Sequence, residues 1–189
     1  VQSGADAIGM VFYDRSPRHV LLDQAAEIAA VIPPFISTVC LFVNAERGDI
    51  NEVISRVKPD LLQFHGDEDE EFCSSFDVAY IKALRVQDGS GLMQSCLDYS
   101  SAKGILLDSY TPGTPGGTGE CFDRSSIPEQ LPLPVILAGG LDSNNVARAI
   151  SITRPWAVDV SSGVEEYPGK KDALKISRFV QAVQSCSTI

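Results

Sequence analysis

The sequence is poor in the residues that build metal sites and disulfide frameworks. It contains two histidines and five cysteines, and no two cysteines have C-x-x-C spacing. An odd number of thiols without that spacing argues against both a disulfide framework and a zinc site. The cysteines are therefore interpreted as reduced thiols of a cytosolic protein, at positions 40, 73, 96, 121 and 186.

Positive charge and long apolar runs are also scarce. The chain has 15 Lys and Arg against 25 Asp and Glu, a formal net charge of −10 and a pI near 4.6. Such a chain has little with which to neutralise a phosphate backbone, so nucleic acid is not expected as a partner. No apolar run approaches the roughly 20 residues that span a bilayer, and the opening VQSGADAIG lacks the features of a signal peptide. We expect a soluble cytoplasmic protein without a membrane partner.

The apolar content is that of one globular domain over residues 1–189. Of the 189 residues, 44% are hydrophobic and 21% are charged. Short β-branched runs recur, and most are apolar at successive positions, as in strands that are buried on both faces. The predicted strands are 7–12, 37–43, 61–64, 79–84, 104–108, 134–140 and 156–163.

Segments of helical period separate these runs. Apolar residues recur at i, i+3, i+4 and i+7 within 25–32, 50–57 and 176–183, and less regular helices are expected at 68–76, 90–98 and 124–131. Short carboxylates stand at or near the starts of such segments, where they can cap free N–H groups: Asp23, Asp49, Asp142 and Asp172. Strand and helix alternate about seven times, which predicts an α/β fold with a parallel sheet.

The distribution of polar residues favours a TIM-type (β/α)8 barrel over an open sheet. Polar residues follow several strands along the whole chain, and a barrel collects all its strand ends at one mouth, whereas an open sheet concentrates its site at a switch point. A barrel normally has eight strands and about seven are predicted here. The opening residues resemble the last turn of a helix with Gly4 as its left-handed cap. The first strand and most of the first helix are therefore expected to be absent.

Asp108 is the first candidate for chemistry, because it ends a buried strand immediately before a glycine-rich loop. At the mouth of a barrel, partial desolvation can raise the pKa of a carboxyl group until it donates a proton near neutral pH. An aspartate at this position can equally well cap its own loop. The residues alone leave both interpretations open.

The last two predicted strands lead into small residues that suit an anion. Gly139 and Gly140 stand in LAGGL, and Ser162 and Gly163 stand in VSSGVE. Many barrels bind phosphate after their final two strands through backbone N–H groups. Glycines also end strands without binding anything, so this pattern is a moderate signal by itself.

Arg18 and His65 complete the candidates. Arg18 follows Pro17 in RSPRH, and its guanidinium suits a carboxylate or a phosphate; Arg15 is a less certain neighbour. Exposed arginines are more often simply solvated. His65 ends another strand and could be a ligand, an acid or base, or a hydrogen bonder of the strand end. Without a second His or Cys at ligand spacing it is not expected to bind a metal.

The motifs together resemble the phosphoribosylanthranilate isomerase family, whose members are (β/α)8-barrel enzymes of tryptophan biosynthesis. The matching stretches are GADAIGMVFYDRSPR, LFVNA, LLQFHGDE, ILLDSYTPGTPGGTGECFD, LAGGLDSNNV and VDVSSGVEEYPGKKD. They occur in the family's order over essentially the whole chain. FDR at 122–124 departs from the aromatic residue usual after FD, which is a minor change in a loop.

The resemblance implies an Amadori rearrangement of N-(5′-phosphoribosyl)anthranilate without a metal or an organic cofactor. It implies that Asp108 is the general acid, that Arg18 binds the anthranilate carboxylate, and that Gly139, Gly140, Ser162 and Gly163 hold the phosphate. His65 is included among the substrate-binding residues, and Asp159, inside the last predicted strand, supports the amine side of the substrate.

The general base is the main departure from the family. In the family it is a cysteine on the first strand, which is expected to be missing, so impaired activity is expected for this chain. Cys40 lies mid-strand in TVCLFVNA, and a buried apolar environment would keep it a thiol.

Two alternatives stay open. One is a non-catalytic phosphosugar-binding or structural module derived from the enzyme. The other is a different phosphosugar barrel, such as indole-glycerol-phosphate synthase, ribulose-phosphate epimerase or the tryptophan synthase α subunit. The two sister activities of the pathway do not explain Asp108 followed by GGTG, and an epimerase would need more metal-ligating histidines than the two present. A monomer or a homodimer is expected.

Overall fold

The computed structural model describes residues 2–86, 89, 91–108, 126–128 and 130–186. The chain forms two compact units, one of Val1–Ala83 with Ser101–Lys103 and one of Leu84–Ser100 with Gly104–Ile189. The single domain expected over 1–189 stays a prediction. Cys121 and the GGTG and FDR motifs lie outside the described residues. The helix expected at 124–131 is not confirmed, because its described residues, 126–128, 130 and 131, form no α-helix.

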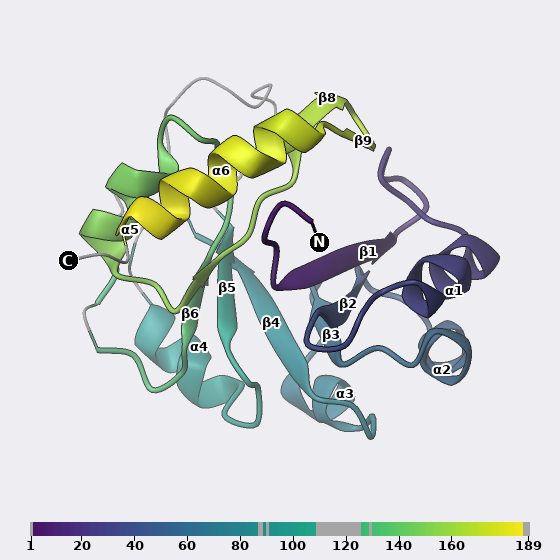
Figure 1. Cartoon of the computed structure of the whole chain (residues 1–189). Coiled ribbons are helices and arrows are strands. Elements are labelled where there is room, and N and C mark those ends of the chain that lie inside the picture. The colour runs from purple at the N-terminus through teal and green to yellow at the C-terminus, as the bar shows by residue number, and fades with distance from the viewer. Residues whose placement is uncertain (1, 87–88, 90, 109–125, 129, 187–189) are drawn as a thin grey trace. The chain divides into compact units, whose positions relative to one another are not determined.

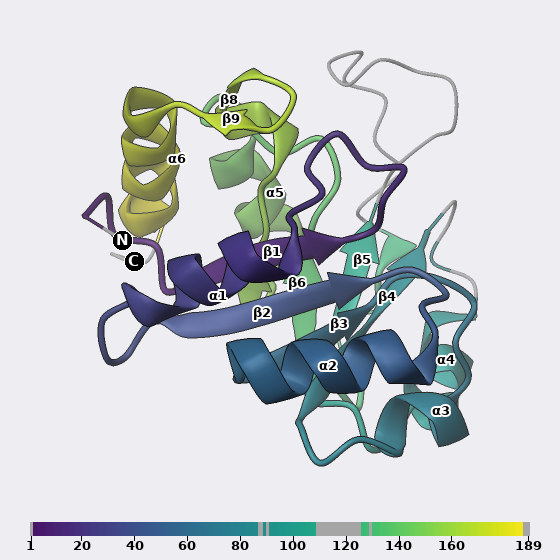
Figure 2. The ribbon, with the colours of Figure 1, turned by 90° about the vertical axis from the view of Figure 1, so that its right-hand side faces the viewer.

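All the predicted strands are present within the described residues, and within each unit strands that follow one another along the chain pair with one another (Figures 1 and 2). The printed pairs are parallel, with Ala7 opposite Ser37 at the start of the first pair. Parallel strands in chain order are the arrangement of a (β/α)8 barrel. The strands are β1 Ala7–Phe12, β2 Ser37–Phe42, β3 Leu61–Phe64, β4 Tyr80–Arg85, β5 Ile105–Asp108, β6 Val135–Leu137 and β7 Ala157–Val158.

The helices follow the strands as the periodicity predicts. They are α1 Leu22–Ala30, α2 Arg47–Val57, α3 Glu70–Ser74, α4 Leu92–Asp98, α5 Val146–Thr153 and α6 Ala173–Cys186. In the first unit, α1 and α2 run alongside β1 and β2 (Figure 2). The predicted cap Asp172 is confirmed, because Asp172 Oδ1 accepts from Lys175 N at 2.8 Å in the first turn of α6. Asp142 Oδ1 accepts from Asn145 N at 3.1 Å in the turn before α5, whose N-cap is Asn145. Asp23 and Asp49 instead lie within the first turns of α1 and α2.

A short hairpin after β7 was not predicted. The turn Ser162–Val164 is a 3-10 helix, and it leads into β8 Glu165–Tyr167, which pairs antiparallel with β9 Lys170–Lys171. Gly169 between the two strands has a φ of 89°, a conformation that favours glycine. The hairpin connects the end of the sheet to α6.

The cysteines of the described residues are free thiols, as expected. Cys40, Cys73 and Cys96 are buried and Cys186 is half-buried. Burial raises the pKa of the Cys40 thiol to about 12, because the apolar surroundings disfavour the thiolate. Cys40 therefore stays protonated at neutral pH.

A buried ion pair in the first unit connects the loops that follow β2 and β3 to strand β4. The side chains of Glu68 and Lys82 are each 3% exposed, and Lys82 Nζ lies 2.8 Å from Glu68 Oε2. Glu68 also accepts from the backbone N of Asn44 at 2.7 Å and of Gly66 at 2.9 Å. The acidic run at 67–71 is thus only partly a helix start: Asp69 caps α3 by accepting from Phe72 N, whereas Glu68 lies in the core.

We expect Lys82→Met to lower the free energy of unfolding by about 3–5 kcal/mol, because it leaves the Glu68 carboxylate buried without its cation. Urea unfolding followed by far-UV circular dichroism measures this loss. The control is Arg56→Met, which removes the exposed partner of Asp23 and should cost at most about 1 kcal/mol. Equal losses for the two variants would contradict the structural importance of the buried pair.

Candidate functional site

The loop after β1 carries Arg18 at the carboxyl end of the strand. Ser16 N donates to Tyr13 O at 2.9 Å, and Arg18 N donates to Ser16 Oγ at 3.1 Å, so the loop folds tightly on itself. Val20 N then donates to Val11 O at 3.0 Å and returns the chain to β1. Arg18 is half-buried at this strand end, which is the location that the sequence predicted for it.

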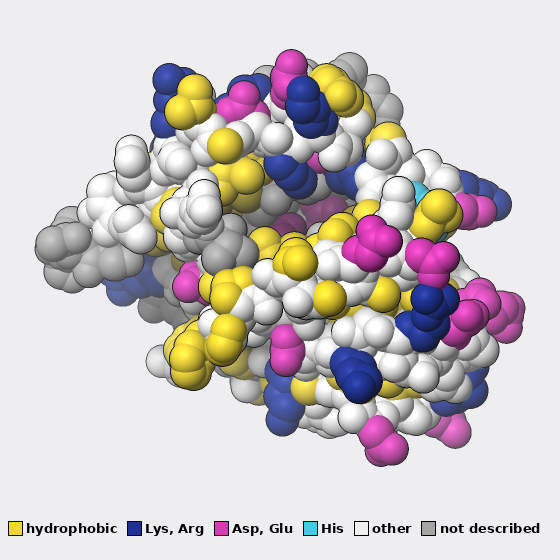
Figure 3. Space-filling model, turned by 45° about the vertical axis from the view of Figure 1, so that its right-hand side comes forward, with side chains coloured by type: hydrophobic (Ala, Val, Ile, Leu, Met, Phe, Trp, Pro, Cys, Tyr) yellow, Lys and Arg dark blue, Asp and Glu magenta, His cyan; other side chains and the backbone are white. Residues whose placement is uncertain are grey.

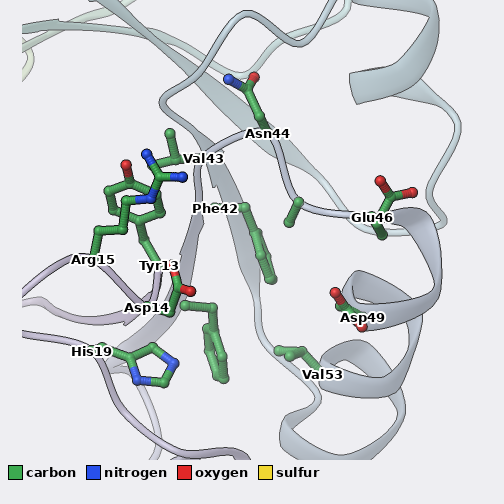
Figure 4. A pocket seen from close by; sticks show the side chains of 12 residues that line it. Tyr13, Asp14, Arg15, His19, Phe42, Val43, Asn44, Glu46, Asp49 and Val53 are labelled. Carbon is green, nitrogen blue, oxygen red and sulfur yellow. The ribbon is translucent and has the colours of Figure 1, made fainter.

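A groove of about 580 Å³ opens between the β1–α1 loop and the β2–α2 loop (Figure 4). The stacked rings of Phe12 and Phe42, with centroids 5.5 Å apart, line it. Arg15 and His19 come from one loop, while Glu46 and Asp49 lie on the opposite side. The other lining residues are Tyr13, Asp14, Val43, Asn44, Ala45 and Val53. Since carboxylates outnumber permanent cations here, the groove is a poor receptor for a phosphate dianion.

His65 follows β3 directly and is half-buried. Its backbone N donates to Phe42 O at 2.9 Å, and its Nδ1 lies 3.4 Å from Gln63 Nε2. The next residue must be small, because a Cβ on Gly66 would lie 2.3 Å from Asn44 Oδ1. The close approach of these two loops fixes the backbone of His65 at the carboxyl end of β3.

Asp108 is the last residue of β5 in the second unit. The three residues before it, Ile105–Leu107, are buried, while Asp108 is half-buried. Its carbonyl oxygen accepts from Val86 N at 3.1 Å, which extends the strand pairing to the very end of β5. The carboxyl group is therefore attached at the point where the strand leaves the core. The glycine-rich loop that follows, at 109–125, lies outside the described residues.

The two predicted phosphate loops contact one another in the second unit. Gly139 and Gly140 have φ values of 79° and 62°, so the chain turns there through a conformation that favours glycine. A Cβ on Gly163 would lie 1.9 Å from the carbonyl oxygen of Leu141. Ser162 is exposed beside it. The structure thus brings together the four small residues that the sequence selected.

Asp159 differs slightly from its prediction. It was expected inside the last strand, but β7 ends at Val158 and Asp159 is the next residue. Its backbone N still donates to Leu137 O at 2.8 Å, and the residue is exposed. Like Asp108, it is therefore attached at a strand end, where a carboxylate can face a ligand.

The described residues contain neither a metal-binding cluster nor a membrane-spanning helix. Among the described residues, no group of three or more His, Cys, Asp or Glu is arranged to hold a metal ion. None of the helices in the described part of the chain is long and apolar enough to cross a membrane. On the face drawn in Figure 3, Lys and Arg side chains are interspersed with Asp and Glu side chains.

Sequence reasoning missed two sets of residues near these strand ends. His19 lines the groove although no motif pointed to it. Glu165 and Lys171 form an ion pair across the unpredicted hairpin, with Lys171 Nζ 3.0 Å from Glu165 Oε1. The Pro-Gly dipeptide between two short charged segments is a turn signal that could have revealed the hairpin.

The chain is similar to known proteins in sequence and in structure. The sequence model of the family described as N-(5′-phosphoribosyl)anthranilate (PRA) isomerase matches residues 1–182. The N-(5′-phosphoribosyl)anthranilate isomerase of Pseudomonas syringae pv. tomato is 57% identical over 182 residues, which cover 96% of this chain and 88% of that protein. That of Pseudomonas fluorescens is 55% identical, with coverages of 99% and 89%. These matches do not support the expected absence of a first βα unit.

Solved structures give the same result. Phosphoribosyl anthranilate isomerase from Thermotoga maritima superposes with a TM-score of 0.86 at 39% identity, covering 97% of this chain and 90% of that one. A second phosphoribosyl anthranilate isomerase structure, in complex with reduced 1-(o-carboxyphenylamino)-1-deoxyribulose 5-phosphate, has a TM-score of 0.80 at 37% identity, with the same coverages. These likenesses and the chain-order parallel sheet confirm the predicted α/β fold of TIM-barrel type. The chain belongs to the N-(5′-phosphoribosyl)anthranilate isomerase family.

Proposed function

We propose that this chain catalyses the Amadori rearrangement of N-(5′-phosphoribosyl)anthranilate to 1-(o-carboxyphenylamino)-1-deoxyribulose 5-phosphate. The observation that carries the proposal is the family match over residues 1–182 together with 57% identity to an isomerase of that name. A related structure at 37% identity holds the reduced form of the product. The same matches disfavour the other phosphosugar barrels considered from the sequence.

Asp108 is assigned the role of general acid. Opening the furanose ring to a Schiff base leaves negative charge on the ring oxygen, so a proton must reach that oxygen as the bond breaks. The position of Asp108 supports the assignment, because the carboxyl is half-buried at the end of a strand whose other residues are buried.

The remaining candidates are assigned to substrate binding. Gly139–Gly140 and Ser162–Gly163 would receive the phosphate through backbone N–H groups, and the contact of Gly163 with Leu141 supports their acting together. The guanidinium of Arg18 would hold the anthranilate carboxylate. Asp159 would contact the amine side, and His65 is kept as a further contact of the substrate. Binding energy from the phosphate orients the reacting carbons without taking part in the chemistry.

The general base must remove the C2 proton of the Schiff base, and the described cysteines do not suit this role. Burial raises the pKa of Cys40 and of Cys73 to about 12 and also raises that of Cys96. Cys186 is the last residue of α6. The general base is therefore not assigned among the described cysteines. Cytoplasmic location and a monomeric or homodimeric state stay predictions.

We expect Asp108→Asn to lower kcat at least about 100-fold, because the amide cannot supply the proton. Anthranilate fluorescence with freshly made substrate follows the turnover, and spontaneous hydrolysis provides the blank. The Kd for the reduced product should stay within about 3-fold of the parent value, because the acid acts on the ring oxygen during the reaction. Turnover equal to that of the parent would remove Asp108 from the role of acid, and a parent that binds but never turns over would favour a non-catalytic module.

We expect Arg18→Ala to weaken binding of the reduced product about 10- to 100-fold, the effect of losing charge-assisted hydrogen bonds to a carboxylate. Isothermal titration calorimetry measures the Kd. Arg15→Ala is the matched control, because Arg15 stands in the same loop but lines the groove beside Tyr13 and Val43. A loss that is larger for Arg15→Ala than for Arg18→Ala would reverse the assignment.

A further inference from the structure

The hairpin after β7 carries a polar cluster that has no part in the function as proposed so far. Lys171 Nζ donates to the carbonyl oxygen of Ser161 at 2.9 Å and to Glu165 Oε1 at 3.0 Å, and lies 3.4 Å from Ser161 Oγ. Ser161 comes immediately before the 3-10 turn Ser162–Val164, and Glu165 comes immediately after it. One ammonium group therefore joins the two ends of the turn.

The carboxylate of this cluster is buried and its cation is not. The Glu165 side chain is 4% exposed, whereas that of Lys171 is 43% exposed. A carboxylate in such surroundings is costly unless it keeps a cation and hydrogen bonds. Lys171 supplies that cation from the opposite strand of the hairpin, so the charge of Glu165 ties β9 to the end of the turn.

Two hydrogen bonds from the start of α6 hold backbone carbonyl groups of the same segment. Asp172 N donates to Val164 O at 2.8 Å, and Lys175 Nζ donates to the carbonyl oxygen of Glu165 at 2.6 Å. Figure 1 shows the hairpin of β8 and β9 at the N-terminal end of α6. The opposite side of the turn meets Leu141, whose carbonyl oxygen leaves no room for a side chain on Gly163. The turn is thus held from both sides.

We propose that Lys171 and Glu165 form a brace that holds the turn Ser162–Val164 in the conformation that receives the phosphate of the substrate. The inference rests on the proposed function, since that function assigns phosphate binding to Ser162 and Gly163. Lys171 and Glu165 act here as positioning residues. An ammonium has three N–H donors, and those of Lys171 face two oxygens of Ser161 and one of Glu165, so the group is engaged in fixing the turn.

The variant that tests the brace is Lys171→Met, with Lys170→Met as its matched control. Lys170 is the neighbouring residue of the same strand, but its partner Glu166, at 2.8 Å, is more than half exposed. We expect Lys171→Met to weaken binding of the reduced product and of inorganic phosphate at least 10-fold, and Lys170→Met to change neither by more than 2-fold. In turnover assays, Lys171→Met should raise KM with kcat within about 3-fold, and Lys171→Arg should restore most of the affinity.

A second measurement tests the stability of the turn Ser162–Val164 in the absence of any ligand. Glu165 N donates to Ser162 O across the turn, so amide hydrogen exchange in the peptide 161–167 reports whether the turn is held. We expect exchange to accelerate at least 10-fold in Lys171→Met and to stay unchanged in Lys170→Met. Unchanged exchange in Lys171→Met would overturn the brace.

The two measurements separate the failure of the inference from the failure of the proposed function. If the parent binds the reduced product and Lys171→Met binds it equally well, the brace does not position the phosphate and the inference alone is wrong. If the parent binds neither the reduced product nor phosphate, the proposed function is wrong, and the positioning role is overturned together with it even where exchange accelerates.

Discussion

Parallel pairing in register is the constraint on which the candidate site depends. In the first unit, Phe12 pairs with Phe42 and Phe42 pairs with Phe64, so three phenylalanines end their strands in one row. In the second unit, Leu107, Leu137 and Val158 form the corresponding row. The residue after each row is the first that can leave the sheet. His65, Asp108 and Asp159 occupy such positions, because each directly follows the residue that its own strand contributes to the row.

The loops beyond these rows are fixed by a few close contacts and buried charges. Gly66 against Asn44 in one unit and Gly163 against Leu141 in the other are approaches that a side chain would prevent. Each is accompanied by a buried carboxylate with a lysine partner, Glu68 with Lys82 and Glu165 with Lys171. The same solution occurs in both units: a glycine permits the approach, and a paired charge of low exposure holds the backbone around it.

Much of the fold was predictable because the information was local. Runs of successive apolar residues predicted β1 to β7, with β1 and β3 predicted to the residue, but not the two short strands of the later hairpin. The runs at 134–140 and 156–163 were too long, because they included the glycine and serine residues that follow β6 and β7. Strand-end position selected Asp108, Arg18 and His65 as candidates, and their roles stay proposals.

The rest depends on partners that are distant in sequence. Glu68 looked like one more acid in an exposed helix start, because its partner lies 14 residues away on β4. The brace of Lys171 and Glu165 depends on a hairpin whose second strand, β9, is only two residues long. Charges of this kind have no periodic signature, since the fold alone decides which of them become buried.

The most direct test of the account is to locate the bound substrate on the molecule. Amide chemical-shift changes in ¹H–¹⁵N spectra, on addition of the reduced product 1-(o-carboxyphenylamino)-1-deoxyribulose 5-phosphate, report the residues that it contacts. We predict the largest changes at Gly139, Gly140, Ser162 and Gly163, with further changes at Asp108 and Arg18. Changes confined to the groove lined by Phe12, Arg15 and Asn44 would contradict the account, because the phosphate would then bind among carboxylates instead of at the glycines and serine assigned to it.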